Sequence, residues 1–347
     1  MAKHRVVVLG PTTDAPLYHE RAEMADLDVE FVQESPKSEG EAIEAVRGAD
    51  AIMMRGGWGT EQVIRAADEA QVLAVYSHGF NHIDVEAATD MGIIVTNGAG
   101  MCAEEVSNQA VTMALALNRQ VVQTTNQLRN TGDWDRSAFL PIDPIDEQTL
   151  GIIGFGNIGR QVARKLGQGW RMETLVYDPY VEPWIISEYG VEQVFELNEL
   201  CSRADYIIVV VPLNTETFHM IGREQFDVMK NSAFFINVCR GSVTDEPALI
   251  DALNEGKIRG AGLDVFEQEP VDPGNPLLQM ENVITAPHLA GASTRSAWLA
   301  SQRASQQVAA VLRGDWPSAG QNPEVAYKLN EKRRMKGSQG AIHGHGG

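Results

Sequence analysis

The fold of this chain is decided by ten residues, Leu150-Gly151-Ile152-Ile153-Gly154-Phe155-Gly156-Asn157-Ile158-Gly159. They form an apolar run that leads directly into the pattern Gly-x-Gly-x-x-Gly, and a helix-like stretch at residues 160–166 follows. Asp178 ends the next apolar run, 19 residues after the last glycine. A strand, a glycine turn, a helix and a second strand ending on an acid are the context in which this pattern binds a dinucleotide.

Each part of this fingerprint has a physical task. Gly154 permits the tight turn, Gly156 lets the backbone approach a pyrophosphate, and Gly159 lets helix and strand pack closely. The start of the following helix offers free N–H groups and the positive end of its dipole to the phosphates. Asp178 is expected to accept hydrogen bonds from ribose hydroxyls and to repel a 2′-phosphate, so the predicted cofactor is NAD and not NADP.

Composition sets limits on the remaining possibilities. A chain of 347 residues favours two domains, and 44% apolar with 22% charged residues is typical of a globular protein. A formal net charge of −19 argues against a nucleic-acid or anionic membrane partner. The three cysteines fit no disulfide framework or zinc spacing. Because no signal peptide or membrane-spanning run is recognisable, we expect a cytoplasmic protein.

Short apolar runs alternate with helix-like stretches, which predicts an α/β protein with parallel sheets covered on both faces. The first series has predicted strands at residues 6–9, 29–32, 51–54, 72–76 and 93–96. One long helix is expected over residues 104–128, because apolar residues recur there at helical spacing. The second series has predicted strands at residues 150–154, 173–178, 206–212, 233–238, 262–265 and 283–286.

The two ends of the chain complete this organisation. A helix is expected at residues 293–312, and its return to the first domain would make that domain discontinuous. The stretch 331–347 is polar and glycine-rich and is expected to be disordered. His343 and His345 lie in it, but two histidines on such a tail are usually solvated, so no metal site is predicted.

Three polar residues follow successive strands of the second series: Arg240, Glu269 and His288. Ligands of open parallel sheets bind beyond the carboxyl ends of the strands, so we expect these side chains at one site. A cation can bind a substrate carboxylate and polarise a carbonyl, and an imidazole can exchange the hydroxyl proton. A carboxylate can orient the imidazole and favour its protonated form. This set predicts hydride transfer to or from a carbonyl.

Between about residues 6 and 323 the chain resembles the D-isomer-specific 2-hydroxyacid dehydrogenase family. The matching segments are the fingerprint with Tyr177-Asp178-Pro179, and residues 79–84 (GFNHID), 211–217 (VPLNTET), 237–246 (NVCRGSVTDE), 262–270 (GLDVFEQEP) and 285–291 (TAPHLAG). The resemblance implies two doubly wound parallel-sheet domains with a cleft between them and a homodimer built through the NAD domains. They are a flavodoxin-like substrate domain (1–101 plus 295–330) and a Rossmann NAD domain (102–294), followed by a flexible tail (331–347).

The resemblance also implies roles for single residues. Arg240 would bind the substrate carboxylate and polarise the carbonyl, Glu269 would orient His288, and His288 would be the acid/base. The residues expected at the cofactor are Gly154, Gly156, Asn157, Ile158, Gly159, Asp178, Pro212, Thr217, Cys239, Asp264 and Gly291. The residues expected at the substrate are Arg55, Ser77, His78 and Gly79, with Arg55 and His78 as candidates for binding a second anionic group.

The activity implied is hydride transfer between NAD(H) and a small D-2-hydroxyacid or 2-oxoacid, and two alternatives stay open. The transcriptional corepressor branch of the family senses NAD(H), retains the catalytic residues and resembles this chain at residues 102–106. Phosphite dehydrogenase uses the same Arg, Glu and His. Formate dehydrogenases of this superfamily are excluded, because they carry glutamine where this chain has Glu269.

Overall fold

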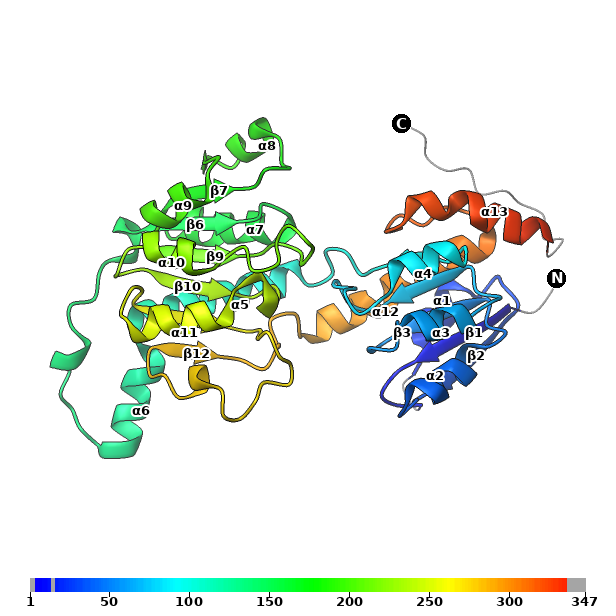
Figure 1. The fold of residues 1–347 in the computed structure, drawn as a ribbon, viewed down its shortest axis with the longest axis horizontal. Coiled ribbons are helices and arrows are strands. Elements are labelled where there is room, and N and C mark those ends of the chain that lie inside the picture. The colour runs from blue at the N-terminus through cyan, green and yellow to red at the C-terminus, as the bar shows by residue number, and fades with distance from the viewer. Residues whose placement is uncertain (1–3, 14–15, 336–347) are drawn as a thin grey trace. The chain divides into compact units, whose positions relative to one another are not determined.

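The computed structural model of the protein describes residues 4–13 and 16–335, which form two compact units (Figure 1). The first unit holds the described residues up to Met101 together with those from Ser293 onward. The second unit is Cys102–Ala292. The chain therefore returns to the first unit two residues before the predicted position, residue 295.

The first unit is built on a five-stranded parallel sheet in the order β2-β1-β3-β4-β5. Its strands are β1 (His4–Leu9), β2 (Val29–Glu34), β3 (Ala51–Met54), β4 (Val72–Val75) and β5 (Ile94–Thr96). Its helices are α1 (Tyr18–Glu23), α2 (Glu39–Val46), α3 (Glu61–Ala66), α4 (Val85–Asp90), α12 (Thr294–Arg313) and α13 (Ala326–Met335). This strand order is that of flavodoxin-like folds, so the predicted fold of the first domain is confirmed.

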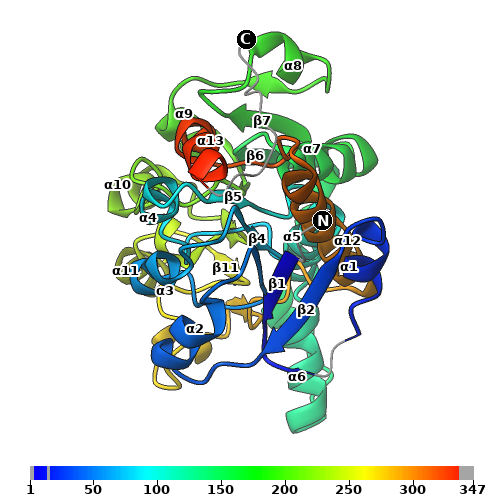
Figure 2. The ribbon, with the colours of Figure 1, turned by 90° about the vertical axis from the view of Figure 1, so that its right-hand side faces the viewer.

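Successive residues of β1 supply two separate cores, because neighbouring side chains of a strand point to opposite faces. Val6 and Val8 pack with residues that flank α1 and with residues of α12, whereas Val7 and Leu9 pack with residues of α2, α3 and α4. Figure 2 shows these two groups of helices on opposite sides of the sheet. A strand buried on both faces is a continuous apolar run, which is why the sequence shows no polar alternation here.

The second unit is built on a seven-stranded parallel sheet in the order β12-β11-β10-β9-β6-β7-β8. Its strands are β6 (Thr149–Ile153), β7 (Glu173–Tyr177), β8 (Glu192–Gln193), β9 (Tyr206–Val209), β10 (Phe234–Asn237), β11 (Gly260–Leu263) and β12 (Val283–Thr285). Its helices are α5 (Ala103–Arg119), α6 (Val121–Thr131), α7 (Asn157–Val162), α8 (Pro183–Ser187), α9 (Leu197–Arg203), α10 (Arg223–Val228) and α11 (Glu246–Asn254). Starting from the glycine-turn strand β6, the sheet grows in both directions, and this confirms the predicted Rossmann arrangement.

The predicted single helix over residues 104–128 is wrong, because the structure divides it into α5 and α6 at Gln120. Gln120 has a φ of 50°, and its backbone N–H bonds to Leu117 O, which ends α5. The apolar face of α5 is buried as far as Leu117, whereas α6 buries none of its residues. Burial against the sheet therefore stabilises α5 but not α6.

The flexible tail predicted over residues 331–347 is wrong for residues 331–335, because α13 continues to Met335. Leu329 is fully buried, and the Arg333 Nε donates a hydrogen bond to Gln71 Oε1 at 2.7 Å. These two positions are four residues apart and share one face of the helix, so two inward contacts order a segment that is otherwise polar. His343 and His345 lie outside the described residues.

Candidate active site

The glycine fingerprint lies at the carboxyl end of β6. Gly154 has a φ of +96°, which glycine adopts readily, and a Cβ at Gly159 would lie 2.1 Å from Gly154 O. Gly156 is different, because a Cβ there would meet no atom within 4 Å. Two glycines therefore shape the turn, and the third leaves open space beside the start of α7, at Asn157 and Ile158, where a pyrophosphate fits.

Asp178 is tied to the same turn. Its Oδ2 accepts a hydrogen bond from Phe155 N at 2.7 Å, and its Oδ1 accepts from Tyr180 N at 2.9 Å and Val181 N at 3.1 Å. A carboxylate has about four acceptor positions, so one position is left for a ribose hydroxyl. These three backbone N–H groups hold the Asp178 carboxylate beside the glycine turn, as the cofactor prediction requires.

Glu269 and His288 are in contact at the carboxyl edge of the same sheet. His288 Nδ1 lies 2.6 Å from Glu269 Oε2, and Glu269 Oε1 accepts a hydrogen bond from Phe266 N at 3.1 Å. Both side chains are partly exposed, at 45% for His288 and 37% for Glu269. Since the carboxylate accepts a hydrogen bond from Nδ1–H, Nε2 is left for proton exchange with a substrate.

Arg240 follows β10, the strand that neighbours β11 in the sheet. The loop after β10 packs closely against the backbone of Phe266, since a Cβ at Gly241 would lie only 1.9 Å from Phe266 O. The Arg240 Nη1 donates to Cys239 O at 2.6 Å. Arg240, Glu269 and His288 thus follow three neighbouring strands, β10, β11 and β12, as their order in the sequence indicated.

Asp264 is fully buried at the end of β11. Its Oδ1 accepts from Leu289 N at 3.0 Å and its Oδ2 from Ala290 N at 2.8 Å, while His288 N donates to Asp264 O at 2.8 Å. Burial raises the pKa of the Asp264 carboxyl, and the two N–H groups oppose that rise. The residue expected at the cofactor therefore also fixes the loop that carries His288.

The other residues expected at the cofactor lie around this edge. Thr217 Oγ1 donates to Pro212 O at 2.6 Å, which closes the loop after β9 on itself. Cys239 is buried and its Sγ lies 3.1 Å from Asn237 Oδ1. Burial raises the pKa of the Cys239 thiol to about 11, although the neighbouring Arg240 acts in the opposite direction. Gly291 lies beside Cys102, since a Cβ on it would be 3.5 Å from Cys102 Sγ.

Sequence reasoning missed two features of the loops around Arg240. Asn237, 1% exposed, donates from Nδ2 to Arg240 O at 2.9 Å and to Thr244 Oγ1 at 3.1 Å. A second imidazole–carboxylate pair joins His219 Nε2 and Glu267 Oε1 at 2.6 Å. The signal for Asn237 was a polar residue inside an apolar strand, whereas no local pattern indicates the second pair.

The predicted substrate residues follow the neighbouring strands β3 and β4 of the first unit. Ser77 Oγ donates to Gly79 O at 2.6 Å, and Asn97 Nδ2 donates to His78 O at 2.7 Å. His78 Nδ1 accepts from Gly100 N at 3.3 Å. These contacts shape the loop after β4, and the loop lies at the edge of the parallel sheet where ligands bind.

Arg55, the fourth of these residues, has a partner in the first unit. Its Nη2 lies 3.0 Å from Glu20 Oε1, and its guanidinium lies 4.4 Å from the centre of the Tyr76 ring. Glu20 is fully buried and also accepts from Tyr76 Oη at 2.6 Å and Ser301 Oγ at 2.9 Å. The positive charge of Arg55 is therefore balanced by an internal carboxylate.

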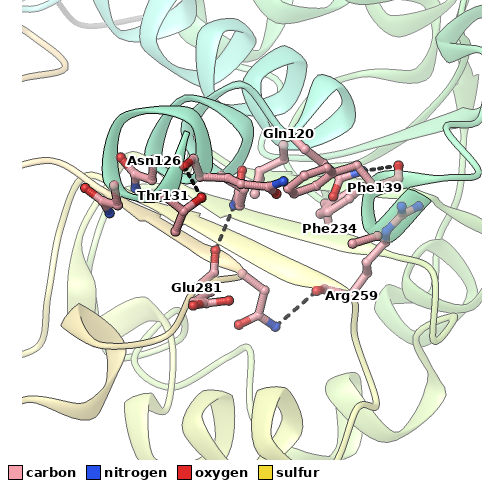
Figure 3. A pocket seen from close by; sticks show the side chains of 13 residues that line it. Gln120, Asn126, Thr131, Phe139, Phe234, Arg259 and Glu281 are labelled. Carbon is pink, nitrogen blue, oxygen red and sulfur yellow. Dashed lines mark hydrogen bonds between the residues drawn. The ribbon is translucent and has the colours of Figure 1, made fainter. Parts of the chain in front are cut away.

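A cavity of about 650 Å³ opens in the second unit, at the opposite edge of its sheet from Arg240, Glu269 and His288 (Figure 3). Phe234 begins β10, and Arg259 and Asn282 directly precede β11 and β12. The Gln123 Nε2 donates to Glu281 O at 2.8 Å across it. Its lining is rich in carboxamides, contributed by Gln120, Gln123, Asn126, Gln127, Asn130 and Asn282.

Neither a metal-binding cluster nor a membrane-spanning helix occurs in the part of the chain that the structure describes. Over residues 4–13 and 16–335, no three His, Cys, Asp or Glu side chains gather as a metal site would need. Within the same residues, no helix has the length and apolar character needed to cross a membrane.

Residues 111–290, just over half of the chain, match the family model described as D-isomer specific 2-hydroxyacid dehydrogenase, NAD binding domain. A D-3-phosphoglycerate dehydrogenase of Methanocaldococcus jannaschii is 43% identical over 277 residues, which are 79% of this chain and 52% of that protein. A glyoxylate reductase of Korarchaeum cryptofilum is 39% identical over 305 residues, 86% of this chain and 90% of that protein.

The fold has solved relatives as well. A D-lactate dehydrogenase of Aquifex aeolicus, crystallised with NAD and lactic acid, has a TM-score of 0.77 and 28% identity, and the match covers 89% of this chain and 96% of that one. The chain spans about half the length of the phosphoglycerate dehydrogenase it matches and nearly all of the glyoxylate reductase.

A Rossmann unit with an intact fingerprint, coupled to a flavodoxin-like unit, defines a nicotinamide-dependent oxidoreductase class. The chain belongs to the D-isomer-specific 2-hydroxyacid dehydrogenase family, and its cofactor is NAD. The predicted family, fold class and cofactor are therefore confirmed, while the roles of single site residues stay predictions.

Proposed function

We propose that the protein reduces a small 2-oxoacid to the D-2-hydroxyacid with NADH and catalyses the reverse oxidation with NAD. The observation that carries this proposal is the 2.6 Å contact between His288 Nδ1 and Glu269 Oε2 at the edge of the NAD-binding sheet. A carboxylate on one ring nitrogen both orients an imidazole and stabilises its charged form.

The proposed mechanism assigns one task to each side chain. The Arg240 guanidinium binds the substrate carboxylate and draws electron density toward the carbonyl oxygen. His288 donates the proton on Nε2 to that oxygen during reduction and takes it back during oxidation, while Glu269 stabilises the imidazolium. NADH held by the glycine turn and Asp178 would supply the hydride for the carbonyl carbon.

We propose glyoxylate and hydroxypyruvate, which have small uncharged groups beside the 2-oxoacid, as the substrates to expect. The nearly full-length similarity to a glyoxylate reductase supports this choice. The pairing of Arg55 with Glu20 supports it too, because a second anionic group would compete with a buried carboxylate for that guanidinium.

The test is NADH oxidation by the purified protein with glyoxylate, hydroxypyruvate, pyruvate, oxaloacetate and bulkier 2-oxoacids. Phosphite and D-3-phosphoglycerate are tested with NAD in the opposite direction. We expect the fastest turnover with glyoxylate or hydroxypyruvate, and its loss in His288→Ala. Tight NADH binding without turnover of any compound would contradict the proposed 2-oxoacid reduction and favour the NAD(H)-sensing alternative. Turnover of phosphite alone would favour phosphite dehydrogenase.

We also propose that the protein is a homodimer joined through its NAD-binding units. The segment from α6 onward exposes large apolar side chains, namely Val121 at 51%, Leu128 at 46%, Trp134 at 86% and Leu140 at 57%. The carboxamides beside them line the cavity of Figure 3. An amide both donates and accepts and carries no charge, so this surface can face a copy of itself across a twofold axis without repulsion.

Light scattering after gel filtration tests the dimer. We expect the natural protein to have twice the chain mass of 37.9 kDa. The double variant Val121→Asp/Leu128→Asp should have the mass of one chain. Val228→Asp, at a similarly exposed apolar position on α10, is the control and should remain dimeric. A monomeric natural protein at micromolar concentration, or a double variant that remains dimeric, would contradict the proposal.

We propose a cytoplasmic location. Cys102, Cys201 and Cys239 are buried and form no disulfide, and reducing compartments preserve such thiols. Fractionation of cells that express the tagged chain, with detection of the tag in each fraction, tests this location.

A further inference from the structure

Two loops at the carboxyl edge of the second sheet lie on either side of the glycine turn. One follows β7 and contains Asp178 and Tyr180, and the other follows β9 and contains Glu216. Because the strand order is β9-β6-β7, the turn after β6 lies between them. The Tyr180 hydroxyl donates a hydrogen bond to Glu216 Oε2, so a side-chain bridge joins the loops over this place.

Both ends of this bridge are held by their own loops. The Tyr180 N–H donates to Asp178 Oδ1 at 2.9 Å, and the Glu216 N–H donates to Asn214 Oδ1 at 2.9 Å. Asn214 Oδ1 also accepts from Thr217 N at 2.9 Å. The two backbones are therefore fixed, while Tyr180 is 74% exposed. A ring presented in this way offers a face to a planar ligand.

The adenine of NAD is the planar group that we expect beside this ring. Asp178 is the acid that meets the adenosine ribose in this type of fold, and Tyr180 follows it by two residues. Adenine lies next to this ribose, so it is the planar group nearest to the Tyr180 ring. A 2′-phosphate on the ribose would lie on the side where Asp178 and Glu216 both carry negative charge.

We propose that Tyr180 and Glu216 form the outer wall of the adenosine site, with the Tyr180 ring covering adenine and the Glu216 carboxylate excluding a 2′-phosphate together with Asp178. The preference for NAD thus depends on an acid from each of two loops. Repulsion between one carboxylate and a doubly charged phosphate about 6 Å away in water corresponds to roughly a tenfold change in affinity. Loss of a stacked aromatic ring weakens binding of a base by at least about fivefold.

The experiment compares two ligands that lack nicotinamide, ADP-ribose and 2′-phospho-ADP-ribose. Their dissociation constants are measured by calorimetry on the full chain, and the ratio of the two constants reports rejection of the phosphate. Glu216→Gln removes the charge and keeps a hydrogen-bond acceptor, so we expect the ratio to fall about tenfold. Glu224→Gln, which makes the same charge change on α10, is the control and should leave the ratio unchanged.

Tyr180 is tested separately from the charge. Tyr180→Ala should weaken both ligands about fivefold without changing their ratio, and Tyr180→Phe should keep most of the affinity because the ring remains. An unchanged ratio in Glu216→Gln, or full affinity in Tyr180→Ala, would overturn the inference. These are binding measurements with no substrate, so their result is independent of whether the proposed 2-oxoacid reduction is correct.

Discussion

Replacing Asp264 by asparagine tests whether one buried anion holds the loop that carries His288. In the natural protein the carboxylate accepts two N–H groups, from Leu289 at 3.0 Å and Ala290 at 2.8 Å. The amide has almost the same shape, but only its oxygen accepts a hydrogen bond. Its NH₂ group therefore faces one of the two N–H donors, and that donor is left buried without a partner.

The expected loss follows from these contacts. Two hydrogen bonds to a charged group, about 1.5–3 kcal/mol each, are replaced by one neutral bond of about 1 kcal/mol and one unsatisfied N–H. Part of this loss is offset, because a carboxylate is no longer buried. We expect a net loss of about 2 kcal/mol in the free energy of unfolding of the second unit, roughly a 30-fold change in its equilibrium constant.

Urea unfolding followed by tryptophan fluorescence measures this loss. With a urea dependence of about 2 kcal/mol/M, the midpoint should fall by about 1 M. Asp251→Asn on α11 is the matched control, since its carboxylate contacts the exposed Arg223 side chain, and it should change the midpoint little. An unchanged midpoint for Asp264→Asn would refute the reasoning from these hydrogen bonds.

The pH dependence gives a second check. The pKa of Asp264 is raised in the folded state, so the folded protein binds more protons than the unfolded chain between the usual value and the raised one. The stabilising contribution of this group is therefore present below its unfolded pKa and is lost as pH rises through the folded pKa. The stability difference between the natural protein and Asp264→Asn should grow as pH is lowered from 7 to 4, and a constant or shrinking difference would contradict the raised pKa.

Three further predictions concern the candidate acid/base, the cofactor site and the buried thiols. His288→Ala should lower kcat by about 10²–10⁴-fold and leave the Kd for NADH within about twofold, because the imidazole handles a substrate proton; an equal loss of NADH affinity, measured by fluorescence titration, would argue against that role. Asp178→Ala should relax the preference for NADH over NADPH, and unchanged discrimination would mean that other residues set it. Burial raises the pKa of Cys201 and Cys239 to about 12 and about 11, so a disulfide reagent at pH 8 should react with these thiols only after unfolding, and fast reaction in the native protein would show that burial is incomplete.

Much of the fold follows from local pattern. Buried parallel strands need continuous apolar runs, and every strand predicted for the two series is present with its ends shifted by a few residues at most. The short helix α1 and the two-residue strand β8 were missed, because segments of this length carry too little periodicity. The helix break at Gln120 was missed for a different reason, since it depends on where burial against the sheet ends.

The sequence by itself determined the family, the cofactor and the sheet edge at which Arg240, Glu269 and His288 occur. The glycines and the acid of the fingerprint act through their own backbone conformation and fixed spacing, so a short stretch of sequence is enough to predict their role. Only the tertiary structure decided which polar groups are paired. Glu20 neutralises Arg55 from 35 residues away, and Asp264 holds the segment after His288 from 25 residues away. Such partners are chosen when burial removes water from a polar group, and that event depends on the packing of distant segments and not on the order of residues along the chain.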